Sequence, residues 1–441
     1  MRINFTNIFN INIKVVAITI ALLTGFVSCS GPLDPEFSNN QSYPQIKHPE
    51  GATLKDIPNN RRVFVFFSLG HNDLLTFLNE DINDLLKGDI PEYGPDKDVV
   101  LLLKHGTSAP TLTQIYTRNG AIVQEPLKIY SDTTVATRKS IINDVLTIAK
   151  DRFPAKSYGM LLSSHGTGWA PEGYCSSPPD KSKSSIMPLL GPDPHRILTK
   201  SIGAHYTGTS SRTIEIEIPD LADAIPMHLD YIIFDACFMG CVEVAYELKD
   251  KCDQICFSQT EVMAAGMDYQ NLLSALFDKN GIDLITVAEN YYNIYKNETN
   301  SVYQSATISV VDCKKLDRLA RVVAKNSQNI YDYAAIDGSR QQVQHYYRPP
   351  DRYYNFPVYH GIFFDLEDIV KKSGASDEDI AELEDALNEC ILCKFATESF
   401  MNVIPIKSHC GLSMYFYDSD RYILNNYYKT LKWEQDVRLI K

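Results

Sequence analysis

The strongest constraint on the fold of this chain is a set of five apolar runs without alternation of polar and apolar residues. Val, Ile, Leu and Phe dominate them, the composition of strands that are covered on both faces in a parallel sheet. The runs are residues 63–69, 99–103, 158–163, 231–234 and 255–258. Strands buried on both faces need helices above and below them, so the runs predict an α/β protein.

The segments between and after these runs fit that architecture. Residues 73–86 and 135–149 repeat apolar side chains at helical spacing. A strand, a helix and a second parallel strand form a right-handed crossover, which predicts a mainly parallel sheet flanked by helices. We expect further helices at 269–277, 284–295, 314–333, 362–370 and 377–395, and strands at 306–311 and 411–417.

Two reactive side chains follow two of the apolar runs. His165 follows the run 158–163, from which only Ser164 separates it. Cys237 follows the run 231–234. Ligand sites of open α/β sheets lie beyond the carboxyl ends of the strands, so both side chains are expected at that edge. A thiolate next to an imidazole that can return a proton to a leaving amine is equipped for acyl transfer.

Backbone amides at the same edge complete this chemistry. The amides of Gly166 and Cys237 are candidates for an oxyanion hole, and a side chain at Gly166 would obstruct a substrate carbonyl. A structural interpretation stands beside the catalytic one, because a strand-end histidine is often only hydrogen-bonded and a cysteine on an apolar strand is often core. Spacing alone leaves both open.

Residues 175–212, between the two reactive side chains, are rich in Ser, Pro and Gly and have no amphipathic period. Turn-forming residues crowd the segment, which predicts an exposed loop. The loop carries the basic residues Lys181, Lys183, Arg196 and Lys200. Exposed loops of this kind are preferred sites of proteolytic cleavage.

The neighbourhoods of both reactive residues resemble the clostripain family of cysteine peptidases, in the caspase-like clan with gingipains, legumain and separase. The resemblance rests on residues 164–169, 229–239 and 258–261, with weaker similarity over 306–312 and 411–416. It implies a caspase-like fold, His165 as general base and acid, and Cys237 as nucleophile, with the amides of Gly166 and Cys237 as oxyanion hole. It also implies self-cleavage in the loop, at Lys181 or Lys183.

The resemblance is looser for substrate preference. Clostripain-like enzymes usually cut after Arg or Lys, which they bind with acidic residues near the nucleophile and further downstream. This chain has Asp235 at the first place, but Met267 at the second, with Asp268 displaced by one. Either the displaced carboxylate reaches a basic side chain, or the pocket accepts an apolar one. Asp235 also fits a strand-end residue that binds backbone amides, and Asp268 fits a helix cap.

The N-terminus has the pattern of a bacterial lipoprotein signal peptide over residues 1–28. Arg2 and Lys14 precede an apolar stretch that is too short to span a bilayer comfortably. Residues 26–29 resemble a lipobox, with Phe26 where Leu is usual, so Cys29 is the predicted lipidation site. A simple secretory signal with an incidental cysteine is the alternative.

Residues 30–60 are rich in Pro, Asn, Ser and Gln with little periodicity. Together with Cys29 they are predicted to form a flexible tether, 29–60, between a membrane and the folded body. This organisation places the protein in the bacterial cell envelope.

Charge and cysteine spacing exclude several functions. Removal of residues 1–28 changes the net charge from −13 to −15, because it removes two basic residues and no acidic one. Such a surface repels phosphate backbones, so nucleic acid is excluded as a partner. The two Cys-x-x-x-Cys pairs, Cys237 with Cys241 and Cys252 with Cys256, are spaced too widely for typical zinc sites.

Residues 377–379 are acidic, but they fit the first turn of a helix better than a calcium site. We therefore expect no required metal or cofactor. Cys390 and Cys393 are expected on one helix, as core residues or a bridged pair. Lipidation of Cys29 leaves nine cysteines, so at least one thiol stays unbridged.

These observations predict a peptidase domain at 61–335, with its exposed loop at 175–212, and a mostly helical supporting region at 336–441. The predicted function is an exported, lipid-anchored and monomeric cysteine endopeptidase that acts on proteins or peptides. The alternative is a catalytically silent surface lipoprotein that binds peptides or partner proteins on the same scaffold.

Overall fold

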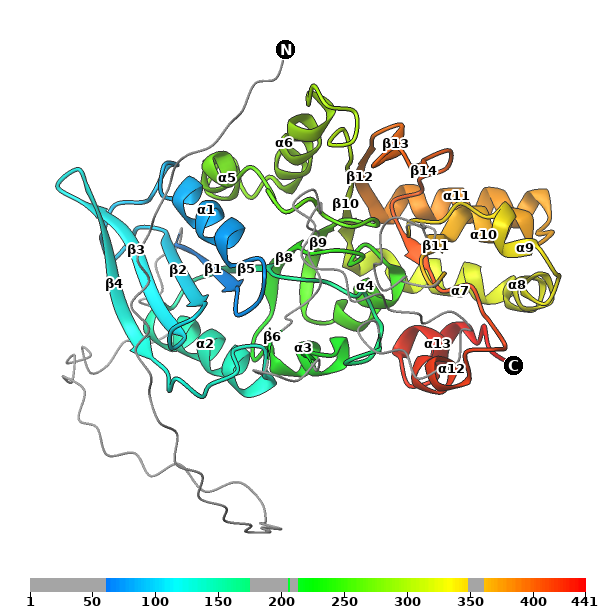
Figure 1. The fold of residues 1–441 in the computed structure, drawn as a ribbon, viewed down its shortest axis with the longest axis horizontal. Coiled ribbons are helices and arrows are strands. Elements are labelled where there is room, and N and C mark those ends of the chain that lie inside the picture. The colour runs from blue at the N-terminus through cyan, green and yellow to red at the C-terminus, as the bar shows by residue number, and fades with distance from the viewer. Residues whose placement is uncertain (1–60, 175–204, 207–212, 348–360) are drawn as a thin grey trace, which may run out of the picture. The chain divides into compact units, whose positions relative to one another are not determined.

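The computed structural model describes residues 61–174, 205–206, 213–347 and 361–441 (Figure 1). The predicted signal peptide, the tether, Cys29, Lys181 and Lys183 all lie outside the described residues. Within the described part, no helix has the length and apolar character needed to cross a lipid bilayer.

A mixed sheet of nine strands forms the centre of the described body, in the order β12-β10-β9-β8-β5-β1-β2-β3-β4. Its five middle strands are parallel, and they are the five predicted apolar runs: β9 (Cys252–Phe257), β8 (Leu229–Asp235), β5 (Ser157–Ser163), β1 (Arg62–Leu69) and β2 (Val99–His105). The predicted mainly parallel, caspase-like sheet is therefore confirmed.

Helices cover both faces of this sheet, as the unbroken apolar runs require. In Figure 1, α1, α5 and α6 lie above the strands and α2 and α3 lie below them. Their bounds are α1 (Leu75–Leu85), α2 (Lys139–Arg152), α3 (Ile218–Ala224), α4 (Val242–Leu248), α5 (Tyr269–Leu276) and α6 (Leu284–Lys296). In β1, residues 63–69 are each at most 2% exposed, which explains why no polar residue alternates there.

One edge of the sheet is an antiparallel hairpin that the sequence analysis did not predict. It consists of β3 (Thr111–Arg118) and β4 (Ala121–Ile129), joined by Asn119 and Gly120 with φ of 53° and 75°. Positive φ at both central positions is the geometry of a tight hairpin turn, for which Asn-Gly is the strongest sequence signal. The sequence analysis missed both strands because neither is an unbroken apolar run. Polar residues interrupt β3, and β4 is largely exposed.

The opposite edge contains a second difference from expectation. The helix predicted over 377–395 ends at Cys390 as α11 (Asp377–Cys390), and the chain continues directly as β12 (Ile391–Ala396). This strand pairs antiparallel with β10 (Thr307–Asp312). Leu392 and Lys394 are exposed while their neighbours are half-buried, the period-two pattern of an edge strand. Cys393 therefore lies on a strand, not on a helix with Cys390.

The helix predicted over 314–333 is also divided. A 3-10 turn, Cys313–Lys315, leads into α7 (Leu316–Lys325), which Asn326 separates from α8 (Ser327–Ala334). The predicted helix 362–370 begins with a short strand. The remaining elements are β6 (His205–Tyr206), β7 (Thr213–Ile214), α9 (Ser339–Gln342), β11 (Phe364–Asp365), α10 (Leu366–Lys372), β13 (Ser399–Phe400), β14 (Ile404–Pro405), β15 (Ser413–Met414), α12 (Tyr422–Tyr428) and α13 (Lys432–Val437).

The C-terminal segment packs behind the turn that follows β8. The Ser413 amide donates to the Gly240 carbonyl at 2.8 Å. The Tyr415 amide and the Tyr428 hydroxyl both donate to Glu243 Oε1, at 2.7 and 2.8 Å. Glu243 is fully buried in the first turn of α4, so one carboxyl group joins α4, the residue that follows β15, and α12.

Burial raises the pKa of Glu243 from 4.5 to about 7, although the hydrogen bonds from Tyr415 and Tyr428 favour its charged form. Between these two values the folded chain holds a proton that the unfolded chain has released, so stability falls as the pH rises through this window. We expect Glu243→Gln to remove that loss. Relative to wild type, its free energy of unfolding should gain roughly 3 kcal/mol between about pH 4 and about pH 8, measured by denaturant unfolding.

Glu247→Gln is the matched control, because Glu247 lies one turn further along α4 and accepts a hydrogen bond from the Lys432 amide at 3.1 Å. A difference between Glu243→Gln and wild type that did not change with pH would contradict the role given to burial.

Candidate active site

The turn after β8 holds Cys237 in a constrained backbone. Phe238, the next residue, has φ of 59°, a left-handed conformation that is rare for a bulky side chain. Its amide donates to the Thr260 carbonyl at 2.9 Å, and its ring stacks on Phe363 with centroids 4.6 Å apart. The Gly240 amide donates to the Ser258 carbonyl at 2.6 Å. These contacts fix the direction in which the chain leaves the sheet at Cys237.

The Cys237 sulfur is buried against the segment after β9. The Val262 amide donates to Sγ at 3.1 Å, and the thiol lies 3.8 Å from the Val262 carbonyl. The residue is 1% exposed. Val262 therefore helps to fix the position of the sulfur.

His165 occupies the equivalent position on the neighbouring strand. β5 and β8 pair in parallel with Ser163 opposite Asp235, and His165 and Cys237 each follow two residues later. His165 Nε2 lies 2.6 Å from Asp73 Oδ1. Because a carboxylate accepts, Nε2 carries the hydrogen, and Nδ1 makes no hydrogen bond to any described residue.

Gly166 brings the two turns into contact. A Cβ atom at this position would lie 2.2 Å from the Cys237 carbonyl oxygen and 2.7 Å from its amide nitrogen. Such distances are impossible for a real side chain, so only glycine fits. The requirement comes from the approach of the His165 turn to the Cys237 backbone, whereas the sequence analysis attributed it to access for a substrate.

Asp73 is a site residue that the sequence analysis did not identify. It lies in the short segment between β1 and α1, and β1 is the neighbour of β5 in the sheet. Its carboxylate is partly exposed, whereas the His165 side chain is 8% exposed. A signal was present, because residues 70–73 follow an apolar run and therefore emerge at the same sheet edge.

Asp235 is the last residue of β8, directly before the turn that holds Cys237, and it is fully buried. Ser163 Oγ donates to its Oδ2 at 2.7 Å, and the Tyr269 hydroxyl donates to the same oxygen at 2.6 Å. Asp81, 3% exposed, lies on the buried face of α1, which packs against α5, the helix that begins with Tyr269. Burial raises the pKa of Tyr269, and the charges of Asp235 and Asp81 add to the effect. Two buried carboxylates therefore lie near one tyrosine hydroxyl.

Asp268 has a different environment. It is the N-cap of α5, where its carboxylate accepts from the Asn271 amide at 3.3 Å and from the Asn271 side chain at 2.8 Å. The adjacent Met267 is 5% exposed. Of the two interpretations offered for Asp268, the structure supports the helix cap. The carboxylates that act on Tyr269 are Asp235 and Asp81, not Asp268.

No cluster of three or more His, Cys, Asp or Glu side chains in the described ranges is suited to holding a metal ion. A mainly parallel sheet flanked by helices, with a thiol and an imidazole in the turns that follow two adjacent strands, is the arrangement of a cysteine peptidase with a caspase-like fold. Comparison with known proteins identifies the family to which the chain belongs.

The clostripain family model matches residues 199–439, more than half of the chain, and the chain belongs to that family. An inactive zymogen C11 protease from Parabacteroides distasonis is 25% identical, with a TM-score of 0.69 over 86% of this chain and 98% of that one. A secreted C11 cysteine protease from Bacteroides thetaiotaomicron is 25% identical, with a TM-score of 0.66 over 86% of this chain and 100% of that one.

A second structure of a secreted C11 cysteine protease from Bacteroides thetaiotaomicron, in complex with an irreversible peptide inhibitor, shares the fold. It is 23% identical, with a TM-score of 0.67 over 86% of this chain and 99% of that one. A search among curated proteins found no match. Family and fold together establish the chain as a cysteine endopeptidase.

We expect Asp73→Asn to lower kcat by roughly 10- to 100-fold, below the full contribution of about 10²–10⁴ from a positioned general base, with little change in KM. An amide orients His165 less well and does not stabilise its protonated form. Steady-state kinetics on a cleaved peptide measures both constants. Asp84→Asn is the matched control, because Asp84 lies on the following helix α1, where it is exposed and paired with Lys87. An unchanged kcat in Asp73→Asn would remove Asp73 from the site.

Proposed function

We propose that the protein is an exported, lipid-anchored cysteine endopeptidase that uses His165 and Cys237, processes itself between them, and cuts after Arg or Lys. The main support for a dyad of His165 and Cys237 is the contact between the two turns that hold these residues. The parallel register puts both residues two positions beyond paired strand ends, and Gly166 packs against the Cys237 backbone.

The reaction follows from the positions of these groups. Cys237 gives its proton to Nδ1 of His165 and attacks the scissile carbonyl carbon, while Nε2 stays hydrogen-bonded to Asp73. The amides of Gly166 and Cys237 donate to the developing oxyanion. His165 then protonates the leaving amine, and water hydrolyses the acyl-enzyme with His165 as base.

Self-processing is supported by the way the ends of the 175–212 segment are held. The Glu172 amide donates to Glu217 Oε1 at 3.2 Å, and the Gly173 amide donates to Glu215 Oε2 at 3.4 Å. These contacts join the residues before and after the segment. A cut at Lys181 or Lys183 would leave both new ends attached to the same body.

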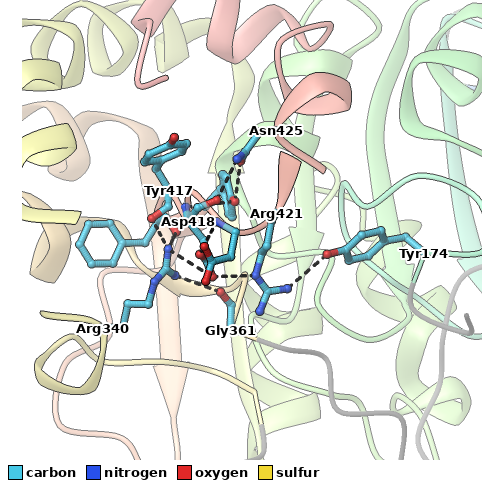
Figure 2. Close-up of polar contacts among 10 residues, drawn as sticks. Tyr174, Arg340, Gly361, Tyr417, Asp418, Arg421 and Asn425 are labelled. Atoms are coloured by element: carbon cyan, nitrogen blue, oxygen red, sulfur yellow. Dashed lines mark hydrogen bonds and ion pairs between the residues drawn. The ribbon is translucent and has the colours of Figure 1, made fainter. Parts of the chain in front are cut away.

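A second anchor holds Tyr174, the residue directly before the segment. Figure 2 shows Arg421 bridging Tyr174 and Asp418: its guanidinium donates to the Tyr174 hydroxyl at 3.3 Å and to Asp418 at 2.9 Å. Arg340 holds the same region from the other side, donating to the Phe416 carbonyl at 2.6 Å. Because these anchors lie in the described body, cleavage in the segment would not detach the strand that carries His165.

The preference for Arg or Lys is supported by the buried carboxylates. Asp235 lies directly before the nucleophile turn, and Asp81 adds a second negative charge near Tyr269. A guanidinium or ammonium that enters between them gains charge-assisted hydrogen bonds in a site of low dielectric constant. We assign the binding of the basic side chain to Asp235 and Asp81, and the helix cap to Asp268.

Export and anchoring are supported by the N-terminal sequence. Residues 26–29 end an apolar stretch in small residues and a cysteine, as a lipobox does. A relative of the same family is described as secreted. We propose processing before Cys29, lipidation of its thiol, and a tether over 29–60 that holds the peptidase at the bacterial cell envelope.

Labelling with an irreversible thiol-directed peptide probe tests the nucleophile. Wild type should be labelled and Cys237→Ala should not, and the variant should also lack the fragments produced by cuts after Lys181 or Lys183. Mass spectrometry reads both. Cys241→Ala is the matched control, because burial raises the pKa of the Cys241 thiol well above its usual value and keeps it unreactive. Labelling that persisted in Cys237→Ala would place the reactive thiol elsewhere.

A positional-scanning peptide library tests the preference. Asp235→Asn and Asp81→Asn should each lower kcat/KM for peptides with Arg or Lys before the cut bond by roughly 10- to 100-fold, and should change cleavage after apolar residues little. Asp268→Asn is the control, since asparagine keeps the helix cap and removes only the charge. A loss confined to Asp268→Asn would move the specificity to Asp268 and contradict the assignment to the buried pair.

A further inference from the structure

Two buried thiols away from the active site lie close enough to be joined. Cys252 Sγ and Cys313 Sγ are 3.8 Å apart, and the residues are 0% and 2% exposed. Burial raises the pKa of Cys252 well above its usual value, and the neighbouring Cys313 adds to the shift. We propose that Cys252 and Cys313 form a structural disulfide in the exported protein, an inference that takes its oxidising environment from the proposed export.

The positions of the two cysteines in the sheet explain the short distance. Cys252 is the first residue of β9, and Cys313 directly follows β10. These strands are antiparallel, with Gln254 opposite Asp312, so the two cysteines lie at the same end of the pair. Both lie at the end away from Cys237, because Phe257 is the β9 residue that leads toward the active site.

The register also excludes a second pairing. Val310 of β10 lies opposite Cys256 on one side and opposite Cys393 on the other. Cys256 and Cys393 are therefore separated by a whole strand, about 10 Å, which exceeds the Cα separation of about 7 Å that a disulfide tolerates. Cys390 donates to the Leu387 carbonyl at 3.6 Å and is the alternative partner that an experiment must distinguish.

The bond forms by thiol–disulfide exchange with an oxidant of the disulfide class in the cell envelope. The thiolate of one cysteine attacks a sulfur of the oxidant disulfide and gives a mixed disulfide between protein and oxidant. The second thiolate then attacks the protein sulfur of this mixed disulfide, and the thiolate of the oxidant leaves. Two protons leave the protein, its two thiols are oxidised together, and the oxidant is reduced to its dithiol. Since both native sulfurs are buried, exchange takes place before folding is complete, and the finished bond resists external reductants.

The disulfide would act on stability rather than on catalysis. It closes a loop between residues 61 positions apart, which restricts the unfolded chain. β9 continues into the segment whose Thr260 carbonyl accepts the Phe238 amide, so the bond secures the strand pair behind the nucleophile turn. We expect a Tm loss on the order of 5 °C in Cys252→Ser and unchanged kcat/KM at moderate temperature.

The test uses the full chain, expressed in a bacterial host that exports it. After cell fractionation, free thiols are alkylated without reductant and the protein is digested with trypsin. A linked pair of peptides 252–279 and 297–314, lighter by two hydrogens than the separate peptides, supports the proposal. Peptide 252–279 contains both Cys252 and Cys256. The link must therefore persist in Cys256→Ser and vanish in Cys252→Ser.

Alkylation of both Cys252 and Cys313 in protein recovered from the envelope fraction would overturn the disulfide while leaving export intact. A link from Cys313 to Cys390 would overturn the pairing. If the protein were absent from the envelope fraction, export would fail, and the purified chain refolded in a glutathione redox buffer would decide the disulfide separately. In that buffer, the same linked peptides support the pair, and alkylated thiols refute it.

Discussion

The parallel pairing of β5 with β8 is the interaction on which the active site depends. Ser163 lies opposite Asp235, so the turns that begin after these residues leave the sheet side by side. Both faces of these strands are covered, so alternation of polar and apolar residues does not set their register. In this register the Ser163 hydroxyl donates to Asp235 across the pair at 2.7 Å. The same register brings the turn that holds His165 and Gly166 against the Cys237 backbone.

A network of buried hydrogen bonds supports the nucleophile turn from behind. The left-handed backbone of Phe238 costs about 1–3 kcal/mol, a strain that persists only where the surroundings impose it. Its amide donates to Thr260, and the adjacent Gln259 side chain donates to Ser309 Oγ at 2.8 Å and to the Gly411 carbonyl at 2.9 Å. Strands and loops distant in sequence thus meet behind one turn, which links the C-terminal segment to the backbone that holds Cys237.

Acidic residues carry three separate tasks in this region. Asp73 accepts a hydrogen bond from the His165 imidazole, Asp235 accepts from Ser163 and Tyr269, and Glu243 accepts from Tyr415 and Tyr428. Their environments differ: Asp73 is partly exposed, whereas Glu243 is fully buried and its pKa rises to about 7. The same functional group therefore lies in three different environments, which differ in solvation and in hydrogen-bond partners.

The amino-acid sequence alone was sufficient for the five parallel strands, the helices between them and the His165 and Cys237 motifs, because these are patterns within short segments. It was not sufficient for β12, since a half-exposed edge strand that directly follows a helix has no boundary in composition. Nor did it reveal Asp73 or Asp81, which approach the site only because β1 pairs with β5 and α1 packs against α5. Contacts between segments far apart in the chain leave no local period, so these residues acquire their roles only when the sheet and its helices are assembled.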